Sequence, residues 1–163
     1  MSVEIRAAVL TVSDRSARGE REDVSGAVLA ELLTEAGAGV VVREVVSDEF
    51  GPLVEKLRAM AGRVDVNLVM TTGGTGLSPR DNTPEATRSV IEREVPGLAE
   101  AMRAESLRQT PTAMLSRGVC GVCAGALVVN LPGSPKAVRE CFAVIRPVLA
   151  HAVAQLAGED HGK

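Results

Sequence analysis

Strand-like and helix-like segments alternate along this chain, and the alternation limits the folds open to it. Three runs rich in β-branched residues, 5–12, 40–46 and 64–71, are predicted to be strands, and the unbroken apolar character of 5–12 is typical of a strand buried on both faces of a parallel sheet. Each run is followed by a stretch whose apolar residues keep helical spacing. The pattern predicts a three-layer α/β domain with a mostly parallel, right-handed wound sheet and helices on both faces.

Capping and turn residues indicate where the helices begin and end. Asp23 or Ser25 suits the start of a helix that stops at Gly37, and Thr83 is expected to cap a helix with Pro84 as its first residue. Ser134 and Pro135 are expected to start the closing helix in the same way. The helices are predicted over about 23–37, 53–62, 85–94, 96–107 and 135–156, and two further short strands over 119–122 and 126–131.

Length and composition predict a single domain and disfavour several classes of protein. A chain of 163 residues suits one domain, 1–163 with a core of about 5–157. The net charge of −3, with two Phe and no Tyr or Trp, argues against nucleic-acid binding. The chain start lacks a basic signal-peptide region, and no uncharged segment suits a membrane span. With an odd number of cysteines, three, we expect a cytoplasmic protein without disulfides.

Three aspartates, Asp14, Asp48 and Asp81, follow the first, second and third predicted strands. In open α/β sheets ligands bind at the carboxyl ends of the strands, so parallel strands would bring all three side chains to one edge. Asp65 precedes its strand and should lie at the opposite edge. Converging carboxylates next to a phosphate suit Mg²⁺. The alternative is that each aspartate only closes a turn or caps a helix.

The segment 71–81, TTGGTGLSPRD, is the densest cluster of ligand-binding residue types in the chain. Three glycines in four residues let backbone N–H groups approach an anion closely, and threonine hydroxyls add donors. The segment is neither a Walker A loop nor a G-x-G-x-x-G motif. A second candidate anion site lies where Gly133, Ser134 and Lys136 surround a helix start. The structural alternatives are a tight turn and a capped helix.

Other catalytic patterns are weaker. Cys120 and Cys123 have C-x-x-C spacing, but a strand-like run follows them, and the only further candidate ligands are the distant Cys141 and His151. We therefore expect buried cysteines that act as small hydrophobic residues.

With two histidines and no Gly-x-Ser-x-Gly, a Ser-His-Asp hydrolase is disfavoured. The residues alone indicate a glycine-rich, carboxylate-edged site for a phosphorylated small molecule with Mg²⁺.

The glycine-rich segment and its continuation PRDNTPEAT, residues 79–87, closely resemble the signature of the molybdopterin-binding MogA/MoaB family. Further matches occur in the same order along about 5–156, including VSD at 12–14, SDE at 47–49, MLSR at 114–117 and NLPGS at 130–134. The resemblance implies a homotrimeric α/β domain that uses Mg-ATP to adenylylate molybdopterin, with release of pyrophosphate. The product then passes to a protein that inserts molybdate.

The resemblance also implies a set of site residues. Asp48 and Asp81 match the family aspartates tied to catalysis and are the candidate Mg²⁺ ligands. Binding of molybdopterin and ATP is assigned to Ser13, Asp14, Thr72, Gly73, Gly74, Thr75, Gly76, Arg80, Ser116, Pro132, Gly133, Ser134 and Lys136.

Two departures from the family pattern bear on activity. Gephyrin-like and plant sequences typically carry an Arg soon after the position of Gly121, whereas 122–126 contains no basic residue here, and Ser47 replaces a common Pro. The missing Arg favours an alternative, a molybdopterin-binding paralogue without transferase activity. Retention of Asp48 and Asp81 favours the enzyme. A nucleotide-pyrophosphate hydrolase is a third hypothesis, which the PRDNTP sequence at 79–84 fits less well.

Overall fold

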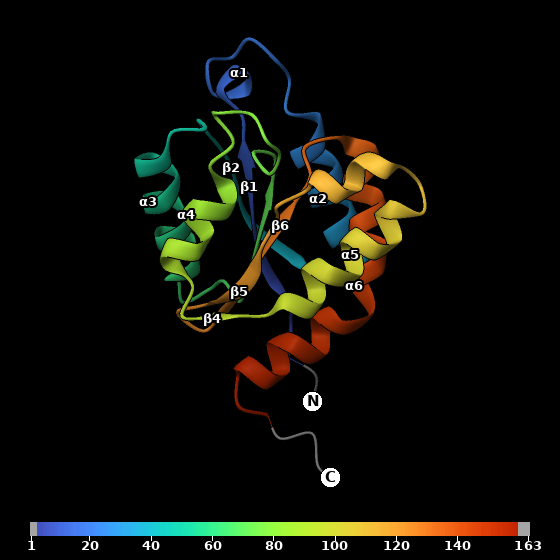
Figure 1. The fold of residues 1–163 in the computed structure, drawn as a ribbon. Coiled ribbons are helices and arrows are strands. Elements are labelled where there is room, and N and C mark those ends of the chain that lie inside the picture. Colours follow the sequence, from blue (N-terminus) through green and yellow to red (C-terminus); the bar gives the residue numbers. More distant parts are fainter. Residues whose placement is uncertain (1–2, 160–163) are drawn as a thin grey trace.

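The computed structural model describes residues 3–159, which form a sheet of six strands with helices on both faces (Figure 1). The strands are β1 (Arg6–Val12), β2 (Gly39–Val46), β3 (Leu68–Thr72), β4 (Arg93–Glu94), β5 (Cys120–Cys123) and β6 (Ala126–Leu131). The helices are α1 (Asp14–Ala17), α2 (Val24–Glu35), α3 (Phe50–Ala61), α4 (Thr83–Val90), α5 (Pro96–Leu107) and α6 (Pro135–Leu156), with a 3-10 helix, η1 (Pro111–Leu115). Within these residues, no helix is both long and apolar enough to cross a membrane.

The strand order is β2-β1-β3-β6-β5-β4. The first four strands in this order run parallel, β5 is antiparallel to β6, and β4 is antiparallel to β5. The register pairs Thr11 with Thr72 and Thr72 with Leu131, so β1, β3 and β6 end together at one edge of the sheet. The predicted three-layer, mostly parallel α/β fold is therefore confirmed.

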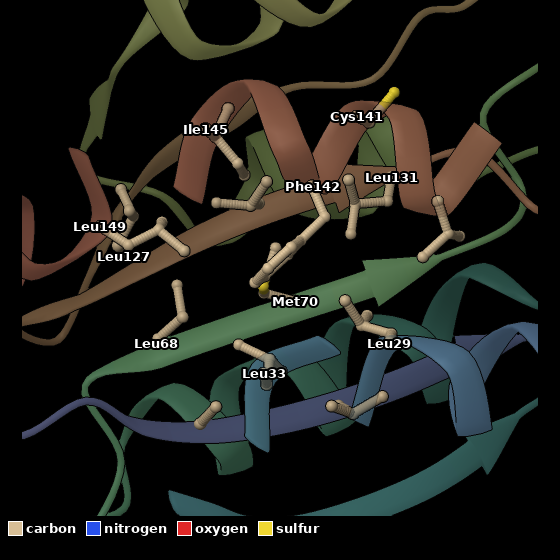
Figure 2. Close-up of a cluster of buried hydrophobic side chains, with 14 of the residues drawn as sticks. Leu29, Leu33, Leu68, Met70, Leu127, Leu131, Cys141, Phe142, Ile145 and Leu149 are labelled. Atoms are coloured by element: carbon tan, nitrogen blue, oxygen red, sulfur yellow. The ribbon is translucent and has the colours of Figure 1, made fainter. Parts of the chain in front are cut away.

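Each face of the sheet carries its own apolar core. On one face, Phe142 of α6 and Leu29 of α2 belong to the same buried cluster as Met70 of β3 (Figure 2). On the other face, Leu53 of α3 is buried in a cluster with Leu10 of β1. The central strands β1, β3 and β6 contribute buried side chains to both clusters, which explains why their sequences lack polar alternation.

The predicted helix caps are confirmed at three places. Asp23, rather than Ser25, is the N-cap of α2, and its carboxylate accepts a hydrogen bond from the Gly26 N–H at 2.9 Å. Ser134 caps α6 by accepting from the Ala137 N–H at 3.1 Å, with Pro135 as the first helical residue. Gly37, with φ of +86°, follows α2 in the left-handed conformation that ends many helices.

The helix predicted over 85–94 is wrong in its second half. Helix α4 ends at Val90, and Arg93–Glu94 form the short edge strand β4, which pairs antiparallel with β5. The Glu92 and Val95 N–H groups donate at 2.8 Å to carbonyl groups of β5. These long-range hydrogen bonds outweigh the local helical pattern of the segment.

Smaller differences concern element boundaries. Strand β3 begins at Leu68 rather than at residue 64, because Val64 is 99% exposed on a turn. Asn82, not Thr83, is the N-cap of α4. Two elements lie in stretches for which none was predicted: α1, whose N-cap is Ser13, and η1.

Candidate active site

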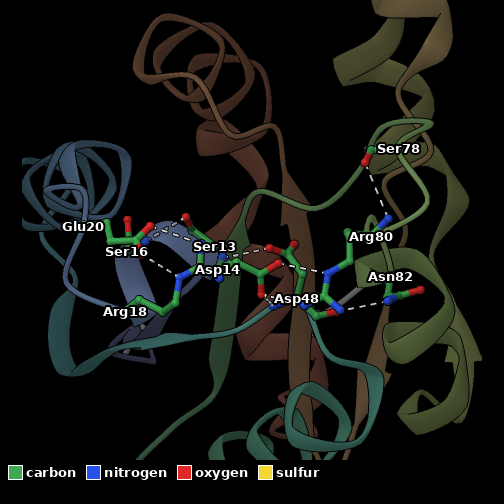
Figure 3. A network of polar contacts seen from close by, with 9 residues as sticks. All are labelled: Ser13, Asp14, Ser16, Arg18, Glu20, Asp48, Ser78, Arg80 and Asn82. Carbon is green, nitrogen blue, oxygen red and sulfur yellow. Dashed lines mark hydrogen bonds and ion pairs between the residues drawn. The ribbon is translucent and has the colours of Figure 1, made fainter.

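The carboxyl ends of β1 and β2 hold Asp14 and Asp48 in direct contact (Figure 3). The Asp14 N–H donates to Asp48 Oδ2 at 2.9 Å, and the Asp48 N–H donates to Asp14 Oδ1 at 3.0 Å. Asp65 lies before β3, at the other edge of the sheet, where its carboxylate pairs with Arg63. Asp14 and Asp48 thus lie together at one edge of the sheet and Asp65 lies at the other, as predicted.

Asp81 reaches the same edge from the loop that follows β3. Its Oδ2 accepts a hydrogen bond from the Ser78 N–H at 3.1 Å. A Cβ atom added to Gly76 would lie 2.9 Å from Asp81 Oδ2, and one added to Gly74 would lie 3.3 Å from Asp48 Oδ1. The two carboxylates thus lie against neighbouring parts of the same glycine-rich loop. We call Asp14, Asp48 and Asp81 the carboxylate cluster.

The electrostatics of the cluster differ from one aspartate to the next. Burial raises the pKa of Asp48, and the negative charges of Asp14 and Asp81 raise it further, while the Asp14 N–H and Arg80 act in the opposite direction. The Arg80 guanidinium donates to Asp14 through Nε at 3.0 Å and Nη2 at 2.8 Å. These bonds hold the pKa of Asp14 below its usual value. A cation bound beside Asp48 and Asp81 would reduce the remaining repulsion.

The carboxylate cluster does not form a metal site made of protein ligands alone, but its carboxylates suit Mg²⁺ that also binds water and a phosphate. Among residues 3–159, no three His, Cys, Asp or Glu side chains are arranged as a ready metal site. Mg²⁺ commonly uses one or two carboxylates and completes its octahedron with water and substrate phosphates. Asp48 and Asp81 are the carboxylates available for that arrangement.

The glycine loop, residues 73–76, has a backbone shape that larger residues would disturb. Gly73 and Gly74 have φ of +99° and +70°. A Cβ on Gly73 would lie 2.4 Å from the Val12 carbonyl oxygen, so this glycine is required for close packing against β1. The Thr83 hydroxyl donates to the Gly73 carbonyl at 2.9 Å, and the Thr72 hydroxyl donates to the Pro132 carbonyl at 2.7 Å. The loop is thus fixed by the core of the domain.

Two cavities open on either side of this loop. The first, of about 310 Å³, lies between the loop, α5, η1 and the start of α6, and we call it the α5 cavity. The second, of about 300 Å³, lies between the ends of β1 and β3 and the starts of α2 and α6, and we call it the α2 cavity. Ser134 lines both cavities, so the start of α6 separates them.

The structure brings most of the predicted binding residues to these cavities. The α5 cavity is lined by Thr75, Gly76, Ser116, Pro132 and Ser134, and the α2 cavity by Ser13, Thr72, Gly73, Gly133 and Ser134. Asp14, Gly74 and Arg80 line neither cavity: Arg80 pairs with Asp14, and a Cβ added to Gly74 would lie 3.3 Å from Asp48 Oδ1. Lys136 lies outside both the cavities and the carboxylate cluster, with its side chain 83% exposed and its Nζ 3.9 Å from Glu140 Oε1.

The segment without a basic residue, 122–126, lies away from the site. It comprises the end of β5, the turn at 124–125 and Ala126, the first residue of β6, whereas Leu131 at the end of β6 pairs with Thr72. At about 3.3 Å per strand residue, the two ends of β6 are roughly 16 Å apart. Within one chain, the missing arginine therefore has no contact with the carboxylate cluster to lose.

The three cysteines, all within the described residues, are free and buried, as the sequence predicts. Burial raises the pKa of the Cys120 thiol to about 12. A thiol with so high a pKa is neutral at physiological pH and is a poor nucleophile or metal ligand. The C-x-x-C spacing thus has a packing role.

Sequence reasoning missed two arginines next to the site. Arg103 of α5 lines the α5 cavity and donates to the Gly118 carbonyl at 3.0 Å. Arg117 contacts both ends of the loop that carries Asp81. The only sequence signal for Arg117 is its place beside Ser116 in the MLSR match, because its partners in this loop are backbone carbonyls that no side-chain pattern reveals.

Comparison with known proteins extends the resemblance to the whole domain. A family described as a probable molybdopterin binding domain matches residues 8–151. The chain is 40% identical over 156 residues to the molybdopterin adenylyltransferase of Helicobacter pylori J99, covering 94% of this chain and 89% of that protein. It is 45% identical over 153 residues to the molybdenum cofactor synthesis protein cinnamon of Drosophila melanogaster, covering 93% of this chain but only 25% of that longer protein.

A solved structure gives the same result for the fold. The molybdopterin biosynthesis enzyme MoaB from Thermus thermophilus superimposes with a TM-score of 0.88 and 49% sequence identity, covering 94% of this chain and 97% of that one. The sequence match, the shared fold and the glycine loop with its aspartates agree, and the chain belongs to the molybdopterin-binding MogA/MoaB family.

Proposed function

We propose that this protein is a molybdopterin adenylyltransferase of molybdenum cofactor biosynthesis, which transfers AMP from Mg-ATP to molybdopterin. The observation that carries the proposal is the pair of cavities on either side of one glycine loop, with the carboxylate cluster at that loop. A reaction that joins two phosphorylated molecules needs two ring-binding spaces with their phosphates directed to a common point. Similarity to the Helicobacter pylori adenylyltransferase along 94% of the chain supports the assignment.

The reaction makes one phosphoanhydride bond and breaks another. An oxygen of the terminal molybdopterin phosphate attacks the α-phosphorus of ATP, and the bond from that phosphorus to the β-phosphate oxygen breaks. Its electron pair leaves with pyrophosphate. Such transfers depend on positioning and on stabilisation of charge rather than on a covalent intermediate with the protein.

The residues of the site divide this work. We assign binding of phosphate oxygens to N–H groups of the glycine loop and of the α6 start, because residues of both segments line the cavities. Asp48 and Asp81 are the residues that would hold Mg²⁺, which when bound supplies positive charge to the phosphates. Arg80 holds Asp14 and adds a second positive charge at the cluster. Lys136, which lies outside both cavities, has no part in this proposal.

A molybdopterin-binding paralogue without activity is the alternative. The feature that favours it, the missing arginine in 122–126, lies at the other edge of the sheet. The carboxylate cluster, by contrast, is complete. The geometry therefore supports the enzyme.

The setting of the reaction is part of the same proposal and follows from the family resemblance. We propose that the protein works in the cytoplasm as a homotrimer. Its adenylylated product would pass to a separate protein that inserts molybdate.

The test is an anaerobic incubation of the purified protein with molybdopterin, ATP and Mg²⁺, followed by mass spectrometry of adenylyl-molybdopterin and pyrophosphate. The proposal expects both products in equal amounts, and none when Mg²⁺ is omitted. Tight molybdopterin binding without either product would instead establish the non-catalytic paralogue.

A further inference from the structure

Arg117 binds both ends of the loop that carries Asp81. Its Nε donates to the Gly76 carbonyl at 2.8 Å, and its Nη2 donates to the Asp81 carbonyl at 2.9 Å. The remaining arm, Nη1, pairs with the Glu85 carboxylate of α4. One planar guanidinium thus fixes the beginning of the loop, its end and the helix that follows it.

The loop between these two carbonyls, residues 76–81, contains Asp81, one member of the carboxylate cluster. It also contains Arg80, which pairs with a second member, Asp14. Within the loop, the Asp81 N–H donates to the Ser78 carbonyl at 2.9 Å, while Leu77 is exposed and contributes little packing. Apart from the Arg80–Asp14 pair, the loop is attached to the rest of the domain through its two bonds to Arg117 and through the hydrogen bonds of Asn82 and Thr83 just beyond it.

The backbone around Arg117 belongs to the wall of the α5 cavity. The Arg117 N–H donates to the Thr75 carbonyl at 2.9 Å, and Ser116 and Gly118 on either side line the cavity. Arg103 fixes the same segment from α5 by donating to the Gly118 carbonyl. The segment 116–118 thus joins the cavity wall to the Asp81 loop.

We infer that Arg117 is a positioning residue that sets the geometry of Asp81 and Arg80 from the wall of the α5 cavity. The inference rests on the proposed function and adds a residue that acts through the backbone of the loop. The hydrogen bonds of the Arg117 side chain go to the Gly76 and Asp81 carbonyls and to Glu85, and none goes to the carboxylate of Asp48 or Asp81. Its effect on the reaction is therefore indirect.

The shape of the guanidinium is what the role requires. Its donors form a rigid planar fork that can bond several acceptors in fixed directions, whereas a lysine ammonium is a single point on a flexible stem. Arg117→Lys keeps the charge opposite Glu85 but cannot reproduce the paired attachments to Gly76 and Asp81. That substitution therefore separates the positioning role from simple charge balance.

The experiment compares wild-type protein with Arg117→Lys and Arg117→Ala. Arg63→Lys serves as the matched control, because Arg63 makes a similar two-pronged pair with Asp65 at the opposite edge of the sheet. We expect Arg117→Lys to lower kcat by about tenfold or more with KM values changed by less than about threefold, since misplaced groups act mainly on the transition state. The half-saturating Mg²⁺ concentration should rise, and millimolar guanidinium should partly restore Arg117→Ala.

A second readout does not depend on the reaction. Hydrogen–deuterium exchange of peptides covering 76–82 should be faster in Arg117→Lys than in wild type and unchanged in Arg63→Lys. Faster exchange with normal kcat and Mg²⁺ dependence would overturn the positioning role, as would exchange equal to that of wild type. If the wild-type protein makes no product, the proposed function fails. In that case the positioning role of Arg117 is judged from two other measurements: faster exchange in 76–82 and weaker Mg²⁺-dependent ATP binding in Arg117→Lys would support it, and wild-type values of both would overturn it.

Discussion

Asp14 and Asp48 each accept a hydrogen bond from the other's backbone N–H, although 34 residues separate them in the chain. This exchange ties the turn after β1 to the turn after β2 and brings two carboxylates close together. Arg80 compensates Asp14, but the arrangement disfavours a charged Asp48. A charged Asp48 thus lowers the stability of the fold, whereas the pairing with Arg80 favours a charged Asp14.

The first prediction concerns Asp48 and pH. Because its pKa is raised in the folded state, ionised Asp48 destabilises the fold, and this destabilisation disappears as pH falls through the raised pKa. Asp48→Asn should therefore raise the melting temperature at pH 7, with a gain that fades under acidic conditions where the wild-type residue is protonated. Thermal unfolding across pH 4 to 8 measures this. Asp65→Asn is the control and should give no gain, since Arg63 lowers the pKa of that exposed carboxyl.

The second prediction concerns Asp81. Asp81→Asn removes a charge at nearly constant shape and leaves an oxygen to accept from the Ser78 N–H. We expect turnover to fall by about 100-fold or more, because the proposed metal site loses one of its two carboxylates. Melting temperature and molybdopterin binding should stay close to those of wild type. An unaltered rate of adenylyl-molybdopterin formation would refute the role assigned to Asp81.

The third prediction concerns the glycine loop. Gly73→Ala would place a methyl group 2.4 Å from the Val12 carbonyl oxygen at a φ of +99°. The loss of stability should be about 2 kcal/mol or more, measured by urea unfolding. Gly51→Ala, in α3 and in open space, is the matched control and should stabilise by up to about 1 kcal/mol. Equal effects of the two substitutions would show that residue 73 tolerates a side chain.

The fourth prediction concerns a buried amide beneath the site. Asn130 of β6 donates to the hydroxyl groups of Thr71 at 3.0 Å and Thr87 at 2.9 Å, and it accepts from the Val119 N–H at 3.1 Å. Asn130→Ala removes these three buried hydrogen bonds and should cost roughly 2–4 kcal/mol in urea unfolding. Thr34→Ala, which removes an exposed hydroxyl on α2, should change stability by less than about 0.5 kcal/mol. A cost for Asn130→Ala as small as that of the control would mean that the network contributes nothing.

The parts of the fold that the sequence predicts well are those with local causes. Asp23 and Ser134 cap helices with their own side chains, and Gly37 takes a backbone conformation that few other residues adopt easily. The convergence of Asp14 and Asp48 follows from the parallel direction of β1 and β2. The caps and the glycine follow from local sequence alone, and the convergence of the aspartates follows once the fold class is known.

The parts that the sequence could not give depend on partners far away in the chain. Arg93–Glu94 form a strand only because β5 offers carbonyls to the neighbouring N–H groups. The role of Arg117 depends on backbone carbonyls up to 41 residues away, which any residue can provide. Lys136 suited a phosphate site by its position in the chain, but its side chain extends into solvent at the start of α6.

Ser134 lies at the boundary of two separate cavities, and this has a consequence for the order of events. Substrates that enter separate openings need not arrive in a fixed sequence. The adenylylated product, however, is one molecule with a ring at each end, and both halves must leave together. Such a two-headed ligand is held more tightly than either half. Under the proposed function, the product would therefore occupy both cavities at once, and it would leave only when both halves dissociate.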